Sequence, residues 1–195
     1  RKLVTTRIWW VLGIVLFGYV AFTSALFGGL FGAISTGAIG PEAAGGEAIP
    51  TEGLPPLVYS TVTAVGYVIP LILGTLSVTG EVRHGTLTPT FLAIPSRARV
   101  LVAKVVIMFV AGAGLGVVGL VASMGVGGAV LAGFGIDPQL GDPETWAMAG
   151  RAVLAMALWA AIGVGIGSLI QNQIAAVVVV IAFTQFVEPI LRTAS

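Results

Sequence analysis

The side chains that could do chemistry gather in one stretch, residues 80–104, which reads GEVRHGTLTPTFLAIPSRARVLVAK. Its charged or titratable residues are Glu81, Arg83, His84, Arg97, Arg99 and Lys104. Apolar residues such as Leu87 and Phe91 stand between them, Gly85 permits a sharp bend, and Pro89 and Pro95 interrupt the segment. This composition fits a short amphipathic helix that lies on a membrane surface and contacts a partner. It fits an ordinary basic loop on anionic lipid as well.

Catalytic and metal chemistry finds little support in the sequence. His84 is the only histidine, so one chain cannot form a multi-histidine metal site, and the absence of cysteine removes thiolate nucleophiles and cysteine-ligated metals. The phosphate-binding pattern G-x-x-x-x-G-K-[ST] is absent, and no lysine follows Gly74 and Gly80. A Ser–His dyad would have to join His84 to a serine of an apolar segment, such as Ser123. We therefore expect neither an enzyme nor a metal or cofactor site in this chain.

The composition is that of an integral membrane protein. Of the 195 residues, 57% are hydrophobic and 9% are charged, whereas soluble domains are about 45–50% apolar and about 25% charged. Such a chain cannot cover its surface with polar groups, which argues against a soluble enzyme and against a disordered protein. The formal net charge is +1 and the basic residues form no stripe, so we expect no nucleic-acid partner.

Five apolar runs are long enough to cross a bilayer, which requires about 20 residues. We expect an all-α, polytopic membrane protein with a single transmembrane domain over 1–195 and spans at 8–32, 57–79, 105–134, 146–170 and 174–191. Trp9 and Trp10 open the first span, where indole rings favour the membrane–water interface. Pro70 should kink the second span because it removes one backbone hydrogen bond.

The distribution of charge predicts the orientation. Basic residues precede the first span and occupy 80–104, while the loops at 33–56 and 135–145 carry six acidic residues and no basic one. By the positive-inside rule, the N-terminus and 80–104 are cytoplasmic and both acidic loops are external. We therefore expect a multi-pass protein of the plasma (inner) membrane.

Three stretches resemble a known family. In 80–104 the pattern Glu–x–Arg–x–Gly–Thr, then Pro–x–Arg, then Lys is made by Glu81, Arg83, Gly85, Thr86, Pro95, Arg97 and Lys104. It resembles the intracellular loop of bacterial type-2 ATP-binding-cassette exporter permeases. RKLVTTRIWW resembles the amphipathic elbow helix before that family's first span. GIGSLIQNQIAAVVVVIAFTQFVEPIL resembles its junction of the fourth and fifth spans, with Gln173 and Glu188 in the family's places.

The resemblance implies six spans per subunit, so we expect a sixth span outside this chain. It implies a dimer of two permease copies, homomeric or heteromeric, embedded in membrane lipid. It also implies a cytoplasmic coupling helix that docks on a separate ATP-binding-cassette ATPase subunit, which would hold ATP and Mg²⁺. The expected ATPase-contacting residues are Glu81, Arg83, His84, Gly85, Thr86, Leu87, Phe91, Pro95 and Arg97. Glu81 could instead brace the segment through Arg83.

Polar groups in or near the spans have two interpretations each. A translocation path between subunits could be lined by Thr63, Tyr67, Pro70, Gln185 and Glu188. Hydrogen bonding between helices explains Thr63, Tyr67 and Gln185 equally well, and Glu188 could be an interfacial carboxylate paired with Arg192. Arg151 is expected to reach the outer headgroups. The small-residue pairs Gly28/Gly32, Gly112/Gly116 and Gly163/Gly167 predict close helix packing rather than a nucleotide site.

The resulting hypothesis is a permease subunit of an ATP-driven exporter that moves an amphipathic or lipid-like substrate by alternating access. One alternative is a membrane scaffold or assembly protein that transports nothing and needs no coupling helix. The other is an ion-coupled secondary transporter, which usually requires ionisable groups near the bilayer midplane.

Overall fold

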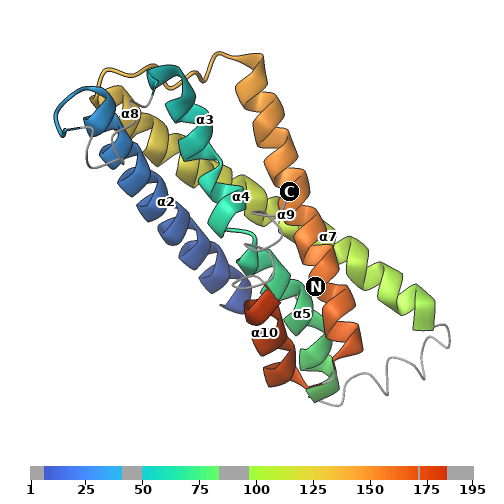
Figure 1. The fold of residues 1–195 in the computed structure, drawn as a ribbon. Coiled ribbons are helices and arrows are strands. Elements are labelled where there is room, and N and C mark those ends of the chain that lie inside the picture. The colour runs from blue at the N-terminus through green and yellow to red at the C-terminus, as the bar shows by residue number, and fades with distance from the viewer. Residues whose placement is uncertain (1–6, 41–49, 84–96, 171, 184–195) are drawn as a thin grey trace. The chain divides into compact units, whose positions relative to one another are not determined.

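The computed structural model describes residues 7–40, 50–83, 97–170 and 172–183, and every regular element within these ranges is a helix (Figure 1). Four helical stretches are long and apolar enough to cross a membrane: Trp10–Ser35, Thr51–Glu81, Ala98–Gly133 and Pro143–Leu169. They correspond to the first four predicted spans, so the all-α prediction is confirmed for this part of the chain. These lengths and compositions are those of a membrane-embedded protein.

The first span is one uninterrupted helix, α2 (Arg7–Ser35). At its end the carbonyl of Gly32 accepts the backbone N–H of Thr36 at 3.1 Å, and the hydroxyls of Ser35 and Thr36 also donate to it, at 3.0 and 2.8 Å. Gly37 then adopts a left-handed conformation with φ 76°, a common way to end a helix. The predicted elbow helix lies mainly in residues 1–6, outside the described residues.

The second span is divided into short helices: η2 (Thr51–Gly53), α3 (Leu54–Tyr59), α4 (Thr61–Val65) and α5 (Val68–Arg83). Prolines open α3, where the missing N–H costs nothing. The chain turns at Gly66 and Tyr67, one helical turn before Pro70, because the proline ring clashes with the carbonyl of residue i−4. The predicted bounds of 57–79 were too narrow, since these helices extend from Thr51 to Arg83.

The third span also begins earlier than predicted. Helix α7 (Arg97–Ala122) starts at Arg97 rather than at 105, passes through a π-helical turn, η3 (Ser123–Gly127), and continues as α8 (Gly128–Gly133). Basic residues near its start do not stop the helix, because Arg and Lys are good helix formers. Together with the extension of α5, this reduces the expected loop of 80–104 to residues 84–96, which lie outside the described residues.

Helix α9 (Pro143–Leu169) forms the fourth span, and α10 (Gln173–Ala182) follows it. Asn172 caps α10, because its side-chain oxygen accepts hydrogen bonds from the backbone of Ile174 at 3.0 Å and of Ala175 at 3.4 Å. The polar turn before the fifth span is therefore where the sequence predicts it. The remainder of the predicted fifth span, 184–191, lies outside the described residues.

The chain divides into two compact units. Unit 1 comprises Arg1–Gly66 and Leu115–Leu154, and unit 2 comprises Tyr67–Gly114 and Ala155–Ser195. Helices α7 and α9 each contribute one part to unit 1 and the other part to unit 2.

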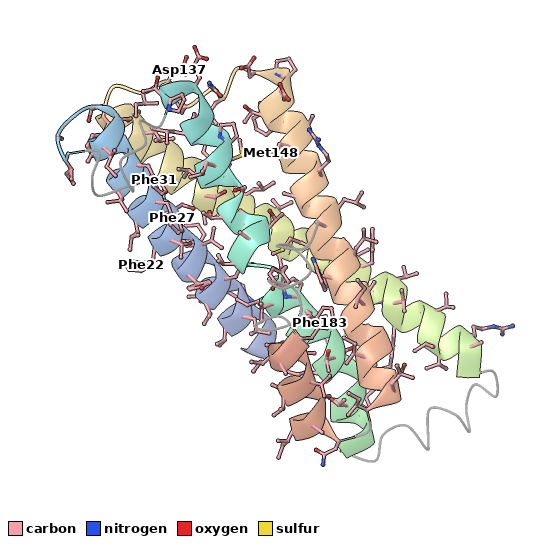
Figure 2. The ribbon with its side chains drawn as sticks, viewed as in Figure 1. Phe22, Phe27, Phe31, Asp137, Met148 and Phe183 are labelled. Atoms are coloured by element: carbon pink, nitrogen blue, oxygen red, sulfur yellow. The ribbon has the colours of Figure 1, made fainter. Side chains whose placement is uncertain are left out.

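Unit 1 has a core of large side chains. Its fully or nearly buried members are Leu54, Val58, Tyr59, Met124, Leu131, Ile136 and Ala149, and partly buried neighbours include Phe31 and Met148 (Figure 2). Phe31 also stacks on Phe27, with ring centroids 5.9 Å apart. A hydrogen bond of 2.7 Å joins the buried hydroxyls of Ser24 on α2 and Thr61 on α4. The core therefore combines apolar burial with one polar link between helices.

Unit 2 is assembled on small residues instead. A Cβ atom added at Gly163 of α9 would overlap the backbone of Leu71 on α5, and one added at Gly167 would lie 2.6 Å from the carbonyl oxygen of Thr75. The hydroxyl of Thr75 lies 3.1 Å from the carbonyl oxygen of Gly163. The backbones of α5 and α9 are therefore in direct contact, as the pair Gly163/Gly167 predicts. Helix α10 also packs against α5 (Figure 1).

Candidate functional site

The ends of α5 and α7 that flank residues 84–96 are joined by an ion pair within unit 2. The Lys104 ammonium nitrogen lies 2.7 Å from Oε1 of Glu81, which is near the C-terminal end of α5. Lys104 itself lies within the first turns of α7. Both residues belong to the pattern that carries the family resemblance, and the fold brings them together although 84–96 separates them in the chain.

A second interaction strengthens this link. The Lys104 Nζ donates to the backbone carbonyl of Ser77, at 2.9 Å, so the ammonium bridges a carboxylate and a carbonyl of the same helix. Cations are favoured near helix C-termini, where backbone carbonyls lack partners. The Lys104 side chain is 17% exposed and that of Glu81 is 37% exposed, so screening by solvent is incomplete at the lysine. The structure joins Glu81 to Lys104, and a brace through Arg83 stays a prediction because the Arg83 side chain lies outside the described part.

The other expected ATPase-contacting residues are placed only in part. Arg83 is the last residue of α5 and Arg97 is the first residue of α7, so both stand at the edges of the intervening segment. The remaining members lie outside the described residues: His84, Gly85, Thr86, Leu87, Phe91 and Pro95.

Three of the five expected path residues lie within the described structure. Tyr67 and Pro70 are buried in unit 2, and the Tyr67 ring lies 5.0 Å from that of Trp159 in a tilted arrangement. Thr63 belongs to unit 1 and donates to the carbonyl of Ser60, 2.9 Å away in the preceding turn. Gln185 and Glu188 lie outside the described residues. The structure thus gives Tyr67 an aromatic packing partner that the sequence did not identify.

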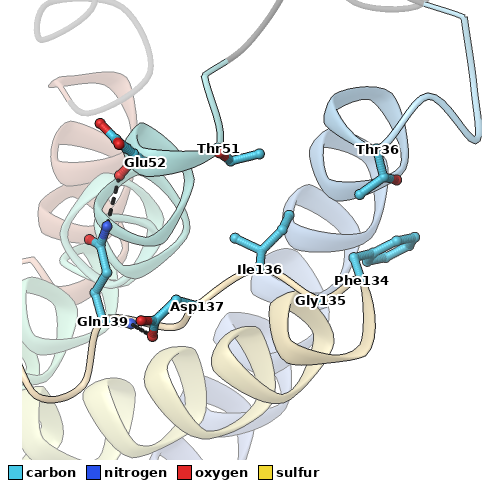
Figure 3. Close-up of a pocket in the computed structure, with 8 residues that line it drawn as sticks. All are labelled: Thr36, Thr51, Glu52, Phe134, Gly135, Ile136, Asp137 and Gln139. Atoms are coloured by element: carbon cyan, nitrogen blue, oxygen red, sulfur yellow. Dashed lines mark hydrogen bonds between the residues drawn. The ribbon is translucent and has the colours of Figure 1, made fainter.

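A cavity of about 230 Å³ lies in unit 1, at the loop between α8 and α9 (Figure 3). The residues that line it come from three segments far apart in the sequence: Thr36, Thr51, Glu52, Phe134, Gly135, Ile136, Asp137 and Gln139. The amide of Gln139 donates to the backbone carbonyl of Glu52 at 3.3 Å, and Asp137 Oδ1 accepts from the backbone N–H of Gln139 at 2.9 Å. Oxygen acceptors and one phenyl ring therefore surround this space.

The loop that forms the cavity is fixed to unit 1 at several points. The Tyr59 hydroxyl donates to the carbonyl of Pro138 at 2.7 Å, and the Trp146 indole N–H donates to the carbonyl of Leu140 at 2.9 Å. Gln139 has φ 53°, which non-glycine residues rarely adopt. Sequence reasoning assigned this acidic loop only to the outside of the membrane. The signal it left unused was Tyr59, because the hydroxyl of a buried tyrosine usually has a hydrogen-bond partner.

Among the described residues, the side chains that combine buried polar character with helix packing are hydroxyls: Ser24, Thr61, Thr75, Thr79, Ser123 and Thr145. No group of three or more His, Cys, Asp or Glu residues that could hold a metal ion is found in this described part. The ion pair between Glu81 and Lys104 can transmit a displacement between α5 and α7. Oxygen atoms that line the cavity can accept a hydrogen bond from a bound donor.

No family model, curated protein or solved structure matches this chain.

Proposed function

We propose that this chain is the membrane-spanning permease subunit of an ATP-driven exporter. It works with a second permease copy and with a separate ATP-binding-cassette ATPase, which binds ATP and Mg²⁺. The substrate is amphipathic or lipid-like, because the membrane-spanning helices are apolar over most of their length. It moves by alternating access between the two sides of the membrane.

The observation that supports this proposal most is the link between Glu81 and Lys104, 2.7 Å apart, at the ends of the helices that flank residues 84–96. In the proposed function those residues contain the coupling helix that receives force from the ATPase. A segment that transmits force needs firm attachment to the helices on both of its sides. The ion pair supplies such an attachment for α5 and α7.

The proposed orientation places the N-terminus and 80–104 in the cytoplasm and the cavity loop outside. This follows from the basic residues at the first two segments and from the acidic residues of the other loops. The absence of cysteine permits a direct test, since a single introduced cysteine has no background reaction. Ser96→Cys should react with a membrane-impermeant maleimide only after the cells are opened, and Gln139→Cys should react in intact cells.

The decisive experiment is a pull-down of the tagged chain from membranes in mild detergent, followed by intact-mass analysis and an ATPase assay. The variant Arg83→Glu/Arg97→Glu should lose a stoichiometric ATPase partner that the unmodified chain retains. Arg151→Glu is the control, because Arg151 lies on α9 and its Nε donates to the carbonyl of Ala147 in its own helix. The cysteine test applied to the double variant checks that the orientation is unchanged.

A chain that purifies without ATPase activity would contradict the proposal and favour a scaffold or an ion-coupled transporter. A partner that binds the double variant as well as the unmodified chain would contradict the placement of the docking segment.

A further inference from the structure

The link between α5 and α7 has a geometry that suits a mechanical role. Lys104 reaches both the Glu81 carboxylate, at 2.7 Å, and the Ser77 carbonyl, at 2.9 Å. Ser77 and Glu81 are one turn apart on the same helix, so the lysine contacts α5 at two successive levels. Two contacts of this kind resist both sliding of α7 along α5 and separation of the two helices.

The position of the link in the chain is equally informative. Residues 84–96, which connect the two helices in the chain, lie outside the described residues. The ion pair joins α5 and α7 directly, beside the point where this segment enters and leaves. A displacement of residues 84–96 therefore acts on α5 and α7 together, because the ion pair holds these two helices to each other.

A contribution to folding stability does not by itself explain the ion pair between Glu81 and Lys104. Ion pairs with partly exposed partners contribute little to folding stability, because solvent screens them and the long side chains lose freedom. Glu81 is 37% exposed, which places it in this class. The glycine-lined contact of α5 with α9 and the packing of α10 on α5 already hold α5 within unit 2.

We propose that Glu81 and Lys104 form a transmission strut that makes α5 and α7 move as one body when residues 84–96 are displaced. This inference rests on the proposed function, in which the displacement comes from the ATPase. Glu81 and Lys104 are positioning residues here, and they act through the helices that they join. Because α7 continues into unit 1, movement of the joined pair passes along that helix to the part of the chain that carries the cavity loop.

The test uses the complex of the full chain with its ATPase and places a single cysteine, Gln139→Cys, in the cavity loop as the reporter. The rate of maleimide labelling is measured with and without ATP, Mg²⁺ and vanadate, and this change is the coupling signal. We expect a change of about fivefold or more in the reporter chain, the lower end of typical coupling between distant sites. Adding Glu81→Gln or Lys104→Gln should remove most of the change. In Lys104→Gln the ATPase should stay bound and active, because Lys104 is not one of the expected ATPase-contacting residues.

Two further variants separate a strut from a merely structural contact. The exchange Glu81→Lys/Lys104→Glu restores opposite charges and should recover the labelling change. Arg99→Gln removes a positive charge from the same end of α7 and should leave the change intact. Elution of each variant as a single peak on size-exclusion chromatography shows that it is folded.

The outcomes distinguish this inference from the function on which it rests. If no ATPase copurifies with the reporter chain, both are wrong. If the ATPase copurifies and the glutamine variants keep the full labelling change, the strut is wrong and the permease function stands. Loss of ATPase binding in Lys104→Gln, or an exchange variant that stays uncoupled, would also overturn the strut.

Discussion

In unit 1 large side chains separate the helices, whereas in unit 2 helices α5 and α9 meet backbone to backbone. Tyr59, Leu131 and Met124 fill the core of unit 1, where Ile136 of the following loop joins them. In unit 2, Gly74 and Gly163 leave no room for even a methyl group against the facing helix. Side-chain cores can rearrange after a substitution, but a contact between two backbones has no flexible atoms to move.

The comparison also extends to polar groups. Unit 1 uses neutral hydrogen bonds: Ser24 with Thr61 joins α2 to α4, and Tyr59 with Pro138 joins α3 to a loop. Unit 2 places a charged pair, Glu81 with Lys104, at the end of its helices. Burial of a neutral hydroxyl in a membrane costs less free energy than burial of a charge. A charged pair is therefore expected near the end of a membrane helix, and a hydrogen bond between hydroxyls is expected within it. Four substitutions test this contrast, beginning with the largest expected effect.

Gly163→Leu should prevent unit 2 from folding. The new side chain would overlap the backbone of Leu71, so the cost exceeds the about 1–3 kcal/mol that overpacking of a side-chain core usually carries. Size-exclusion chromatography in detergent should show aggregate or loss of the protein. Gly165→Leu is the matched control, because nothing lies within 4 Å of a Cβ at Gly165 on the same helix, and it should elute normally. Equal behaviour of the two variants would remove the evidence for backbone contact.

Leu131→Ala should destabilise unit 1 by about 3 kcal/mol, through lost burial and a residual cavity. Leu131 is fully buried in the core of large side chains. Unfolding in a graded series of denaturing detergent measures the difference in free energy of unfolding. Leu26→Ala, at a leucine that is 48% exposed on α2, should cost much less. A loss for Leu131→Ala as small as that of the control would mean that unit 1 does not depend on this core.

Thr75→Val should destabilise unit 2 by about 1 kcal/mol, within the range measured for hydrogen bonds inside membrane proteins. The substitution keeps the shape of the side chain but removes the hydroxyl that lies 3.1 Å from Gly163 on α9. The same unfolding assay applies, with Thr63→Val as control because the hydroxyl of Thr63 donates only to a carbonyl in its own turn among the bonds described. If both variants lose the same stability, the bond between α5 and α9 adds nothing beyond a hydrogen bond within a helix.

Gln139→Gly should change the stability of unit 1 by less than about 0.5 kcal/mol. Glycine relieves the left-handed backbone at φ 53°, which costs about 1 kcal/mol in other residues, but it also gains freedom in the unfolded chain. The lost contact with the Glu52 carbonyl is exposed and contributes little. A loss above about 1 kcal/mol in the unfolding assay would instead show that Gln139 holds the cavity loop to Glu52.

Prediction from the sequence succeeded where the signal was local. Five apolar runs predicted spans, and four of them correspond to described helices that are long and apolar enough to cross a membrane. Pro70 predicted the interruption at Gly66 and Tyr67, because proline geometry acts on a segment without reference to its neighbours. Span ends were less accurate. Charged residues such as Glu81 and Lys104 were treated as loop residues, although they continue α5 and α7 and are stabilised there by each other.

In the candidate sites, too, local patterns were predictable from the sequence and contacts between distant segments were not. The pattern from Glu81 to Lys104 was visible in the sequence, but sequence reasoning offered Arg83 as the partner of Glu81. Nothing in the sequence pointed to Trp159 beside Tyr67, or to a cavity formed by Thr36, Glu52 and Gln139. These groups come from segments that are far apart in the chain, so their proximity depends on how the helices pack.

The sequence by itself determined that this chain is helical, apolar enough for a membrane, and charged mainly outside its apolar runs, because composition and hydrophobic run length fix those properties residue by residue. Only the tertiary structure decided which glycines contact a backbone, which residue pairs with Glu81, and that the helices divide into two units. Those properties depend on distances between helices, and many packings satisfy the same apolar pattern.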